Sequence, residues 1–220
     1  MLSKATLQFL KDLAENNNRE WFNDNKPRFK EAQGEFIGLV AQLIGRISVF
    51  DPPIARLNPE KSIFRIYRDT RFSKDKTPYK TNFGAHLVDT AAKVHDRAGY
   101  YIHLEPGQSF LAGGAYLPPG PWINAIRESI DKRGSKLEAI LAADDFKKLF
   151  GGLSGDKLKT SPRNYPADHP RIELLRYKSF LAVHNFRDEL ITSNKFIDHA
   201  AQVFEALKPL DDFLNQSLGA

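Results

Sequence analysis

Hydrophobic residues in the first quarter of the chain repeat at the spacing of amphipathic helices. Leu7, Leu10 and Leu13 predict a helix over residues 3–16, and Pro27 suits the first turn of a second helix. The second helix has the longer apolar stripe, made of Phe29, Phe36, Val40, Leu43, Ile44 and Ile47. The chain is therefore expected to begin with two helices.

The middle of the chain changes to an alternation of period two, which is typical of strands with one buried face. The predicted strands are residues 63–68, 83–89, 99–105 and 109–116. Because the last three follow one another closely, they should form an antiparallel meander with one polar face.

Helical patterns return after the Pro-Pro-Gly-Pro run that ends at Pro121. The expected elements are helices over 121–132 and 136–142, short helices in DFKKLF and HPRIELLRYK, a strand over 179–186, and a helix over 194–218 that Pro209 kinks or divides. This order indicates an α+β fold, in which N-terminal and C-terminal helices cover an antiparallel sheet. We expect a single domain over residues 1–220, because the later helices need the sheet to cover their apolar stripes.

Composition narrows the class of protein. Of the 220 residues, 41% are hydrophobic and 27% are charged, as in an ordinary globular domain. There is no cysteine, which excludes disulfides, thiolate catalysis and cysteine-ligated metal sites. No leader-like or membrane-spanning apolar run is found, so the expected location is the cytoplasm, with no membrane partner.

The net charge of +5 is concentrated in one segment. Residues 61–80 contain seven basic and two acidic side chains, whereas the other 200 residues carry 25 of each sign. Such a concentration favours a local anion site. The ligand-binding candidates are Arg65, Tyr67, Arg68, Arg71, Lys74, Lys76, Tyr79 and Lys80. The alternative is a solvated loop whose cations pair with acids elsewhere in the chain.

Two residues on the polar face of the meander are candidates for acid–base catalysis. His103 and Glu105 are two positions apart and so share a face of the predicted strand, and His86 is expected on the neighbouring strand. A histidine oriented by a carboxylate suits a general base. Two histidines and a glutamate also suit a metal ion, and a solvent-facing sheet with satisfied polar groups is the third interpretation. No metal ligand is assigned.

The signatures of several enzyme classes are missing. The sequence has no Walker loop, no dinucleotide fingerprint, no HExxH and no GxSxG. His103-Leu104-Glu105 matches the first half of a zinc-deaminase signature, but the second half requires cysteines. The cofactor, the reaction and the oligomeric state are therefore left open, as is whether the protein is an enzyme.

Several longer stretches resemble a family of conserved hypothetical proteins, domain of unknown function 2461. They are NREWFNDNKPRF, FRIYRDTRFSKDKTPYKTNFGAHL, GYYIHLEPGQSFLAGGAYLPP and RYKSFLAVHNF. The resemblance covers nearly the whole chain. It implies one domain of about this length in a mostly bacterial, cytoplasmic family, and it implies no reaction, cofactor or catalytic residue.

The basic segment thus predicts a binding or catalytic domain for a phosphate-bearing or other anionic ligand. A nucleic-acid-binding module is the first alternative, because aromatic residues alternate with the cations. A protein-interaction module with an acidic partner is the second.

Overall fold

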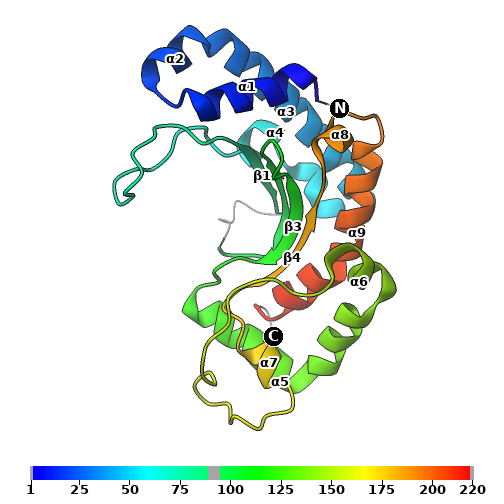
Figure 1. Cartoon of the computed structure of the whole chain (residues 1–220). Helices are drawn as coiled ribbons and strands as arrows, with labels where there is room; N and C mark the ends of the chain where they lie inside the picture. The colour runs from blue at the N-terminus through cyan, green and yellow to red at the C-terminus, as the bar shows by residue number, and fades with distance from the viewer. Residues whose placement is uncertain (1, 89–94, 219–220) are drawn as a thin grey trace. The chain divides into compact units, whose positions relative to one another are not determined.

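A computed structural model describes residues 2–88 and 95–218. The α+β prediction is confirmed: a four-stranded antiparallel meander in the order β1-β2-β3-β4 is flanked by helices from both ends of the chain (Figure 1). The strands are β1 (Phe83–Leu87), β2 (Gly99–Leu104), β3 (Phe110–Ala115) and β4 (Phe180–Asn185). Each lies inside a stretch where the sequence predicted a strand, although residue 89 of the predicted second strand lies outside the described residues.

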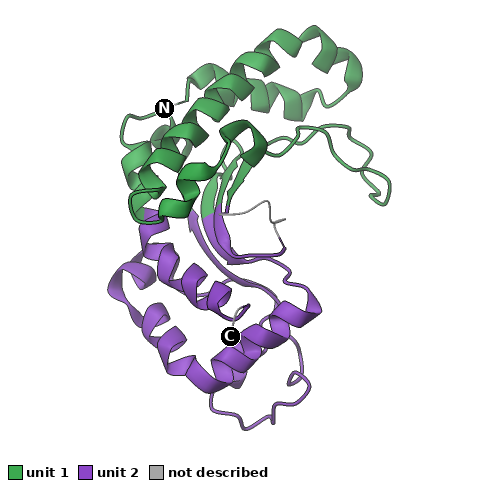
Figure 2. Cartoon of the chain, turned by 180° about the vertical axis from the view of Figure 1, so that it is seen from behind, with its two compact units in different colours: residues 1–87, 101–111, 185–202 green, residues 88–100, 112–184, 203–220 purple. Residues whose placement is uncertain are grey.

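The chain forms two compact units (Figure 2). Unit 1 contains residues 1–87, 101–111 and 185–202, and unit 2 contains residues 88–100, 112–184 and 203–220. The prediction of a single domain stays a prediction. The Pro-Pro-Gly-Pro run is not a boundary between them, because unit 2 continues on both sides of it.

Unit 1 begins with three helices: α1 (Lys4–Glu15), α2 (Arg19–Asp24) and α3 (Lys26–Ile47). Ser3 caps α1 by accepting a hydrogen bond from the Thr6 N–H at 3.3 Å, and Asn18 caps α2 by accepting from the Trp21 N–H at 2.9 Å. Pro27 lies in the first turn of α3, as predicted. The pattern of the sequence did not separate the short α2 from α3.

The core of unit 1 lies between α3 and the meander. The α3 stripe is buried from Phe36 to Ile47, and the Phe36 ring stacks on Phe83 of β1 at 5.4 Å between centroids. Helix α1 packs on α3 as well. Each large apolar side chain buried in this way contributes roughly 1.5–3 kcal/mol, so the stripe fixes which face of β1 points inward. After α3 come η1 (Pro52–Arg56) and α4 (Pro59–Ser62), and α8 (Asp188–Ile191) comes later in the chain.

The predicted strand over residues 63–68 is wrong. Only two isolated bridges occur there, Ile63 with Ala85 and Tyr67 with Tyr79. The Phe64 N–H still donates to the Gly84 carbonyl at 2.8 Å, but the chain then leaves the sheet. From there it pairs with the segment around Pro78, which has no N–H to donate, so a ladder cannot extend.

Unit 2 contains α5 (Gly120–Ala142), α6 (Asp144–Phe150) and α7 (Ile172–Leu175). Two helices were predicted where α5 runs, and the helix is interrupted between them by the non-helical backbone of Arg133 (φ −132°, ψ 24°). Helix α9 (Phe196–Gln216) continues through Pro209 without being divided. Its buried residues on both sides of the proline, Leu207 and Leu210, favour an unbroken helix. No described helix is apolar over a length that would cross a bilayer.

Candidate functional site

The basic segment forms an antiparallel excursion between α4 and β1, which we call the arm (residues 65–80, teal in Figure 1). Tyr67 and Tyr79 face each other in an isolated bridge. Beside them, the Arg68 N–H donates to the Pro78 carbonyl at 2.9 Å, and the Lys80 N–H donates to the Ile66 carbonyl at 2.8 Å. The base of the arm is therefore a short two-stranded ribbon.

The returning half of the arm is docked on the start of the chain. The Asn17 side chain donates to the Tyr79 carbonyl at 2.9 Å and accepts from the Tyr79 N–H at 3.0 Å. The Tyr79 ring stacks on Phe22 of α2, with centroids 4.0 Å apart and planes 15° apart. Burial raises the pKa of the Tyr79 phenol, so it remains a neutral packing group. These contacts place the arm beside α2.

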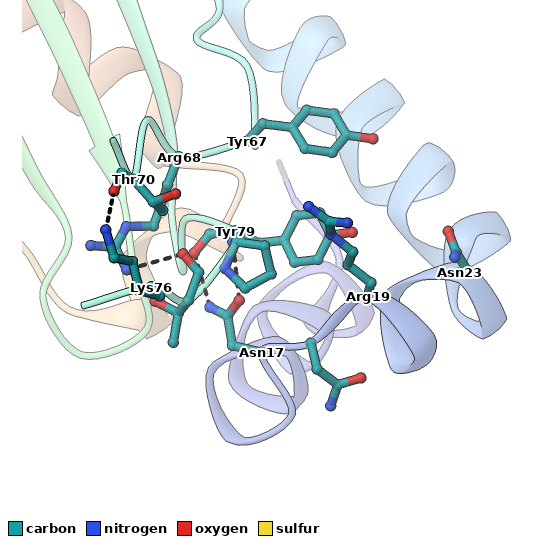
Figure 3. Close-up of a pocket in the computed structure, with 11 residues that line it drawn as sticks. Asn17, Arg19, Asn23, Tyr67, Arg68, Thr70, Lys76 and Tyr79 are labelled. Carbon is teal, nitrogen blue, oxygen red and sulfur yellow. Dashed lines mark hydrogen bonds between the residues drawn. The ribbon is translucent and has the colours of Figure 1, made fainter. Parts of the chain in front are cut away.

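A pocket of about 850 Å³ lies where the arm meets α2 and the turn before it. It is lined by Asn17, Asn18, Arg19, Asn23, Tyr67, Arg68, Thr70, Lys76, Thr77, Pro78 and Tyr79. Figure 3 shows Arg68, Thr70 and Lys76 on one side and Arg19 and Asn23 on the other. Among the residues that the structure describes, the lining thus holds three cations and no carboxylate. Its volume is within the usual range for small-molecule sites.

The three cations keep donors for a ligand. Arg68 uses only Nη1 within the arm, donating to Asp75 at 2.5 Å and to the hydroxyl and carbonyl of Thr77. Lys76 donates one bond to the Thr70 carbonyl at 2.9 Å and has three protons to give. Among the described residues, none forms a hydrogen bond or ion pair with the exposed Arg19 guanidinium. The pocket is therefore suited to oxygen acceptors that carry negative charge.

The two acids of the arm are engaged within it, at positions outside the pocket. The Thr77 N–H, followed by Arg68, lowers the pKa of Asp75 to about 2. Hydrogen bonds from Arg71 lower the pKa of Asp69 to about 2. Both carboxylates are exposed, so these pairs contribute little to stability. The two ion pairs fix the local geometry of the arm and offset part of the repulsion among its basic side chains.

The structure brings together half of the predicted ligand-binding residues. Tyr67, Arg68, Lys76 and Tyr79 line the pocket, whereas Arg65, Arg71, Lys74 and Lys80 do not. Arg71 forms a two-bond ion pair with Asp69, and Arg65 and Lys74 are exposed. Lys80 lies with Nζ 5.2 Å from the centre of the Phe64 ring, where burial and then Arg65 lower the pKa of its amine.

Sequence reasoning missed the other wall of the pocket. Asn17, Arg19 and Asn23 are 42 to 63 positions from the residues of the arm, and they match no functional motif. NREWFNDNKPRF, which contains Arg19 and Asn23, carries part of the family resemblance, but that resemblance implies no site residue. The Asn16-Asn17-Asn18 run at its start is typical of a break between two helices. Its role in holding the arm depends on tertiary packing and is not encoded in that pattern.

His103 and Glu105 form a hydrogen-bonded chain on the other face of the meander from α3. His103 Nε2 lies 3.1 Å from Glu105 Oε2, and His103 Nδ1 lies 3.0 Å from the Tyr101 hydroxyl. The Thr81 hydroxyl donates to Glu105 Oε1 at 2.6 Å. The imidazole stacks on Phe110 at 4.6 Å between centroids. These hydrogen bonds link Thr81, directly after the arm, to β2.

The possible chemistry of these hydrogen-bonded side chains follows from the Glu105 carboxylate, which can only accept hydrogen bonds. When Nε2–H donates to Glu105, Nδ1 is left to accept the Tyr101 O–H. His103 is then placed to take a proton from Tyr101, a residue that the sequence did not single out. The His103 side chain is only 14% exposed. A reactant therefore has little direct access to the imidazole.

The position of His86 agrees with the expected hairpin. Gly84, two residues before it, faces the Tyr101 hydroxyl, so close that a Cβ on Gly84 would lie 2.7 Å from that oxygen. Because alternate residues of a strand share a face, His86 lies on the same face as Tyr101 and His103. None of these residues lines the arm pocket. Within the described ranges, no three His, Asp or Glu side chains are arranged as a metal site.

The family model for a conserved hypothetical protein (DUF2461) matches residues 5–213. The chain belongs to the DUF2461 family. Comparisons with the curated proteins and with the solved structures give no significant match. The region shared with DUF2461 includes both walls of the arm pocket. It also includes the four hydrogen-bonded side chains of Thr81, Glu105, His103 and Tyr101. The family description names no reaction, so a function has to be argued from these two sites.

Proposed function

We propose that the arm pocket binds a phosphate-bearing or other anionic ligand. The observation that carries this proposal is the lining itself, which contains Arg19, Arg68 and Lys76 and, within the described part of the chain, no carboxylate. Like charges held close together repel one another unless an anion or an acid offsets them. Among the described residues, Asp75 and Thr77 engage only Nη1 of Arg68, which leaves its other nitrogens to bind an oxyanion.

The geometry favours a ligand held from two sides. The arm supplies Arg68 and Lys76, and α2 supplies Arg19 and the amide of Asn23. Arginine suits paired oxygens of one phosphate, and lysine supplies a compact charge. Tyr67, about half exposed, adds an aromatic face to the same pocket.

The test is thermal unfolding in inorganic phosphate and pyrophosphate, compared with sodium chloride at equal ionic strength. A ligand that binds only the folded state adds about 2.7 kcal/mol at a hundredfold excess over its Kd. We expect both anions to raise the Tm of the wild-type chain. The Arg19→Ala and Lys76→Ala variants should lose this increase.

The chain offers a matched control for each variant. Arg65→Ala and Lys74→Ala remove exposed cations of the same type from the arm, outside the pocket. Their Tm increase should match that of the wild type. Equal increases in all five proteins would mean that the salts act through general exclusion from the surface, and the proposed site would be rejected.

Acid–base chemistry at the chain of Tyr101, His103 and Glu105 is the second candidate. The observation in its favour is the continuous hydrogen bonding from the Thr81 hydroxyl to the Tyr101 hydroxyl. In this proposal His103 is the base, Glu105 orients it, and Tyr101 meets the reactant.

The cytoplasmic location is likewise a proposal, supported by a chain without cysteine.

A further inference from the structure

Two aromatic rings of the arm face solvent. The Phe72 side chain at the tip is 95% exposed, and Tyr67 at the base is 52% exposed. Tyr67 contacts the rings of Phe22 and Tyr79, at 6.2 and 5.5 Å between centroids. Phe72 has no such support from a described ring and serves no core. A ring displayed in this way is suited to a partner with a flat apolar face.

Cations accompany both rings. The Arg71 guanidinium lies 5.8 Å from the centre of Phe72, and Arg68 lines the pocket together with Tyr67. The arm as a whole has six basic side chains and two acidic ones. A ligand that matched the arm would therefore repeat both a negative charge and a flat ring along its length.

The size of that ligand follows from the position of Phe72. Tyr67 lines the pocket, whereas Phe72 lies outside the lining. A ligand that contacts both must extend beyond the pocket, which a mononucleotide held there would not need to do. We infer, on the basis of the proposed anion site, that the ligand is a single-stranded nucleic acid, with a phosphate in the pocket and bases stacked on Tyr67 and Phe72.

The physical chemistry favours a single strand over other polyanions. Every base has a face that stacks on an aromatic ring, and every nucleotide brings a phosphate. In a duplex the bases are already stacked on one another, so the rings would have no open face to meet. An acidic peptide would satisfy the cations but would leave both rings facing water.

The experiment is fluorescence anisotropy with a labelled oligothymidylate of about 15 nucleotides, within the range of known single-strand sites. Binding should weaken as salt increases, with a log–log slope of about −0.7 for each phosphate neutralised. Phe72→Ala should weaken binding about tenfold, the usual order for losing one stacked base. Because Phe72 is exposed, this variant should keep the wild-type Tm.

Substitutions at the same position separate stacking from apolar contact. Phe72→Trp should bind at least as tightly as the wild type, whereas Phe72→Leu should bind as weakly as Phe72→Ala. Equal affinity for all four proteins would overturn the inference, because the strand would then be held by charge alone. A duplex, a thymidine mononucleotide or a polyglutamate that bound as tightly as the oligonucleotide would overturn it too.

Failure of this inference is distinguishable from failure of the anion site. If phosphate raises the Tm through Arg19 and Lys76 but the oligonucleotide does not bind, the inference is wrong and the proposed function stands. If neither binds, both are wrong. If the oligonucleotide binds and phosphate displaces it, and Phe72→Ala weakens binding, both are supported.

Discussion

Asn17 and Tyr79 are 62 positions apart in the sequence and are joined by two hydrogen bonds. The amide of Asn17 donates to the Tyr79 carbonyl and accepts from the Tyr79 N–H, as a neighbouring strand would. The Asn17 side chain thereby satisfies both backbone polar groups of Tyr79, which is only 4% exposed. The docking of the arm therefore depends on Asn17.

Replacing Asn17 by alanine should destabilise the protein by about 1–3 kcal/mol, because the Tyr79 N–H and carbonyl lose their partner while partly buried. Urea denaturation measures the change. Asn23→Ala is the control, since Asn23 is an exposed pocket residue, and its effect should stay within about 0.5 kcal/mol. A change for Asn17→Ala no larger than that of the control would contradict this account of the docking.

Gly84→Ala should also destabilise the protein, by about 1–3 kcal/mol, since the added Cβ would lie 2.7 Å from the Tyr101 hydroxyl. Adding Tyr101→Phe should restore part of the loss, because it removes the closest atom. Gly38→Ala in α3 meets open space and should instead stabilise the helix by about 0.5–1 kcal/mol. Thermal unfolding of the two single variants and the double variant gives the coupling free energy between positions 84 and 101. Strict additivity would show that the hydroxyl is not the obstacle.

In its neutral form, His103 should carry its proton on Nε2. The reason is that the Glu105 carboxylate can only accept, which leaves Nδ1 to accept from Tyr101. Long-range ¹⁵N–¹H correlation spectra distinguish the two tautomers. Glu105→Gln removes this constraint and serves as the comparison. A proton on Nδ1 in the wild-type chain would reverse the proposed direction of proton transfer.

The Asp75 carboxyl should titrate with a pKa of about 2, well below its ordinary 3.8. Because the folded pKa is the lower one, the unfolded chain binds the proton more readily. The stabilising contribution is therefore present above about pH 4 and is lost as the pH falls toward 2. A carboxyl ¹³C titration measures the pKa directly.

Arg68→Ala tests the causes of this pKa shift. The pKa of Asp75 should rise but stay below 3.8, because the bond from the Thr77 N–H is the larger cause and remains. Asp69 is an internal control, since its pKa depends chiefly on Arg71 and should not move. An Asp75 pKa near 3.8 in the wild-type chain would mean that this turn of the arm is not formed in solution.

The sequence predicted the elements whose pattern is local. Alternation located β2, where Tyr100, Ile102 and Leu104 are buried, and the helical stripe located α3. The same rule placed His103 and Glu105 on one face, where they do meet. These successes share a cause, because each depends only on residues a few positions apart.

The errors also share a cause. The alternation of residues 63–68 was correct for an extended chain, but it could not reveal that Tyr67 pairs with Tyr79 and not with the sheet. The charge count located the arm without showing which cations face the pocket. Arg19 joined the site only because Asn17 and Phe22 hold Tyr79 beside α2. A partner so distant in sequence leaves no trace in local periodicity.

The shortness of α2 has a consequence for how the pocket comes into being. A six-residue helix is not stable alone, so α2 depends on its tertiary contacts, among them the stacking of Phe22 on Tyr79 of the arm. The arm in turn depends on α2 and the turn before it. The two walls should therefore melt and reform as one cooperative unit, below the free energy of global unfolding. Their amide hydrogens would exchange through a shared opening, and a bound ligand would slow both walls together.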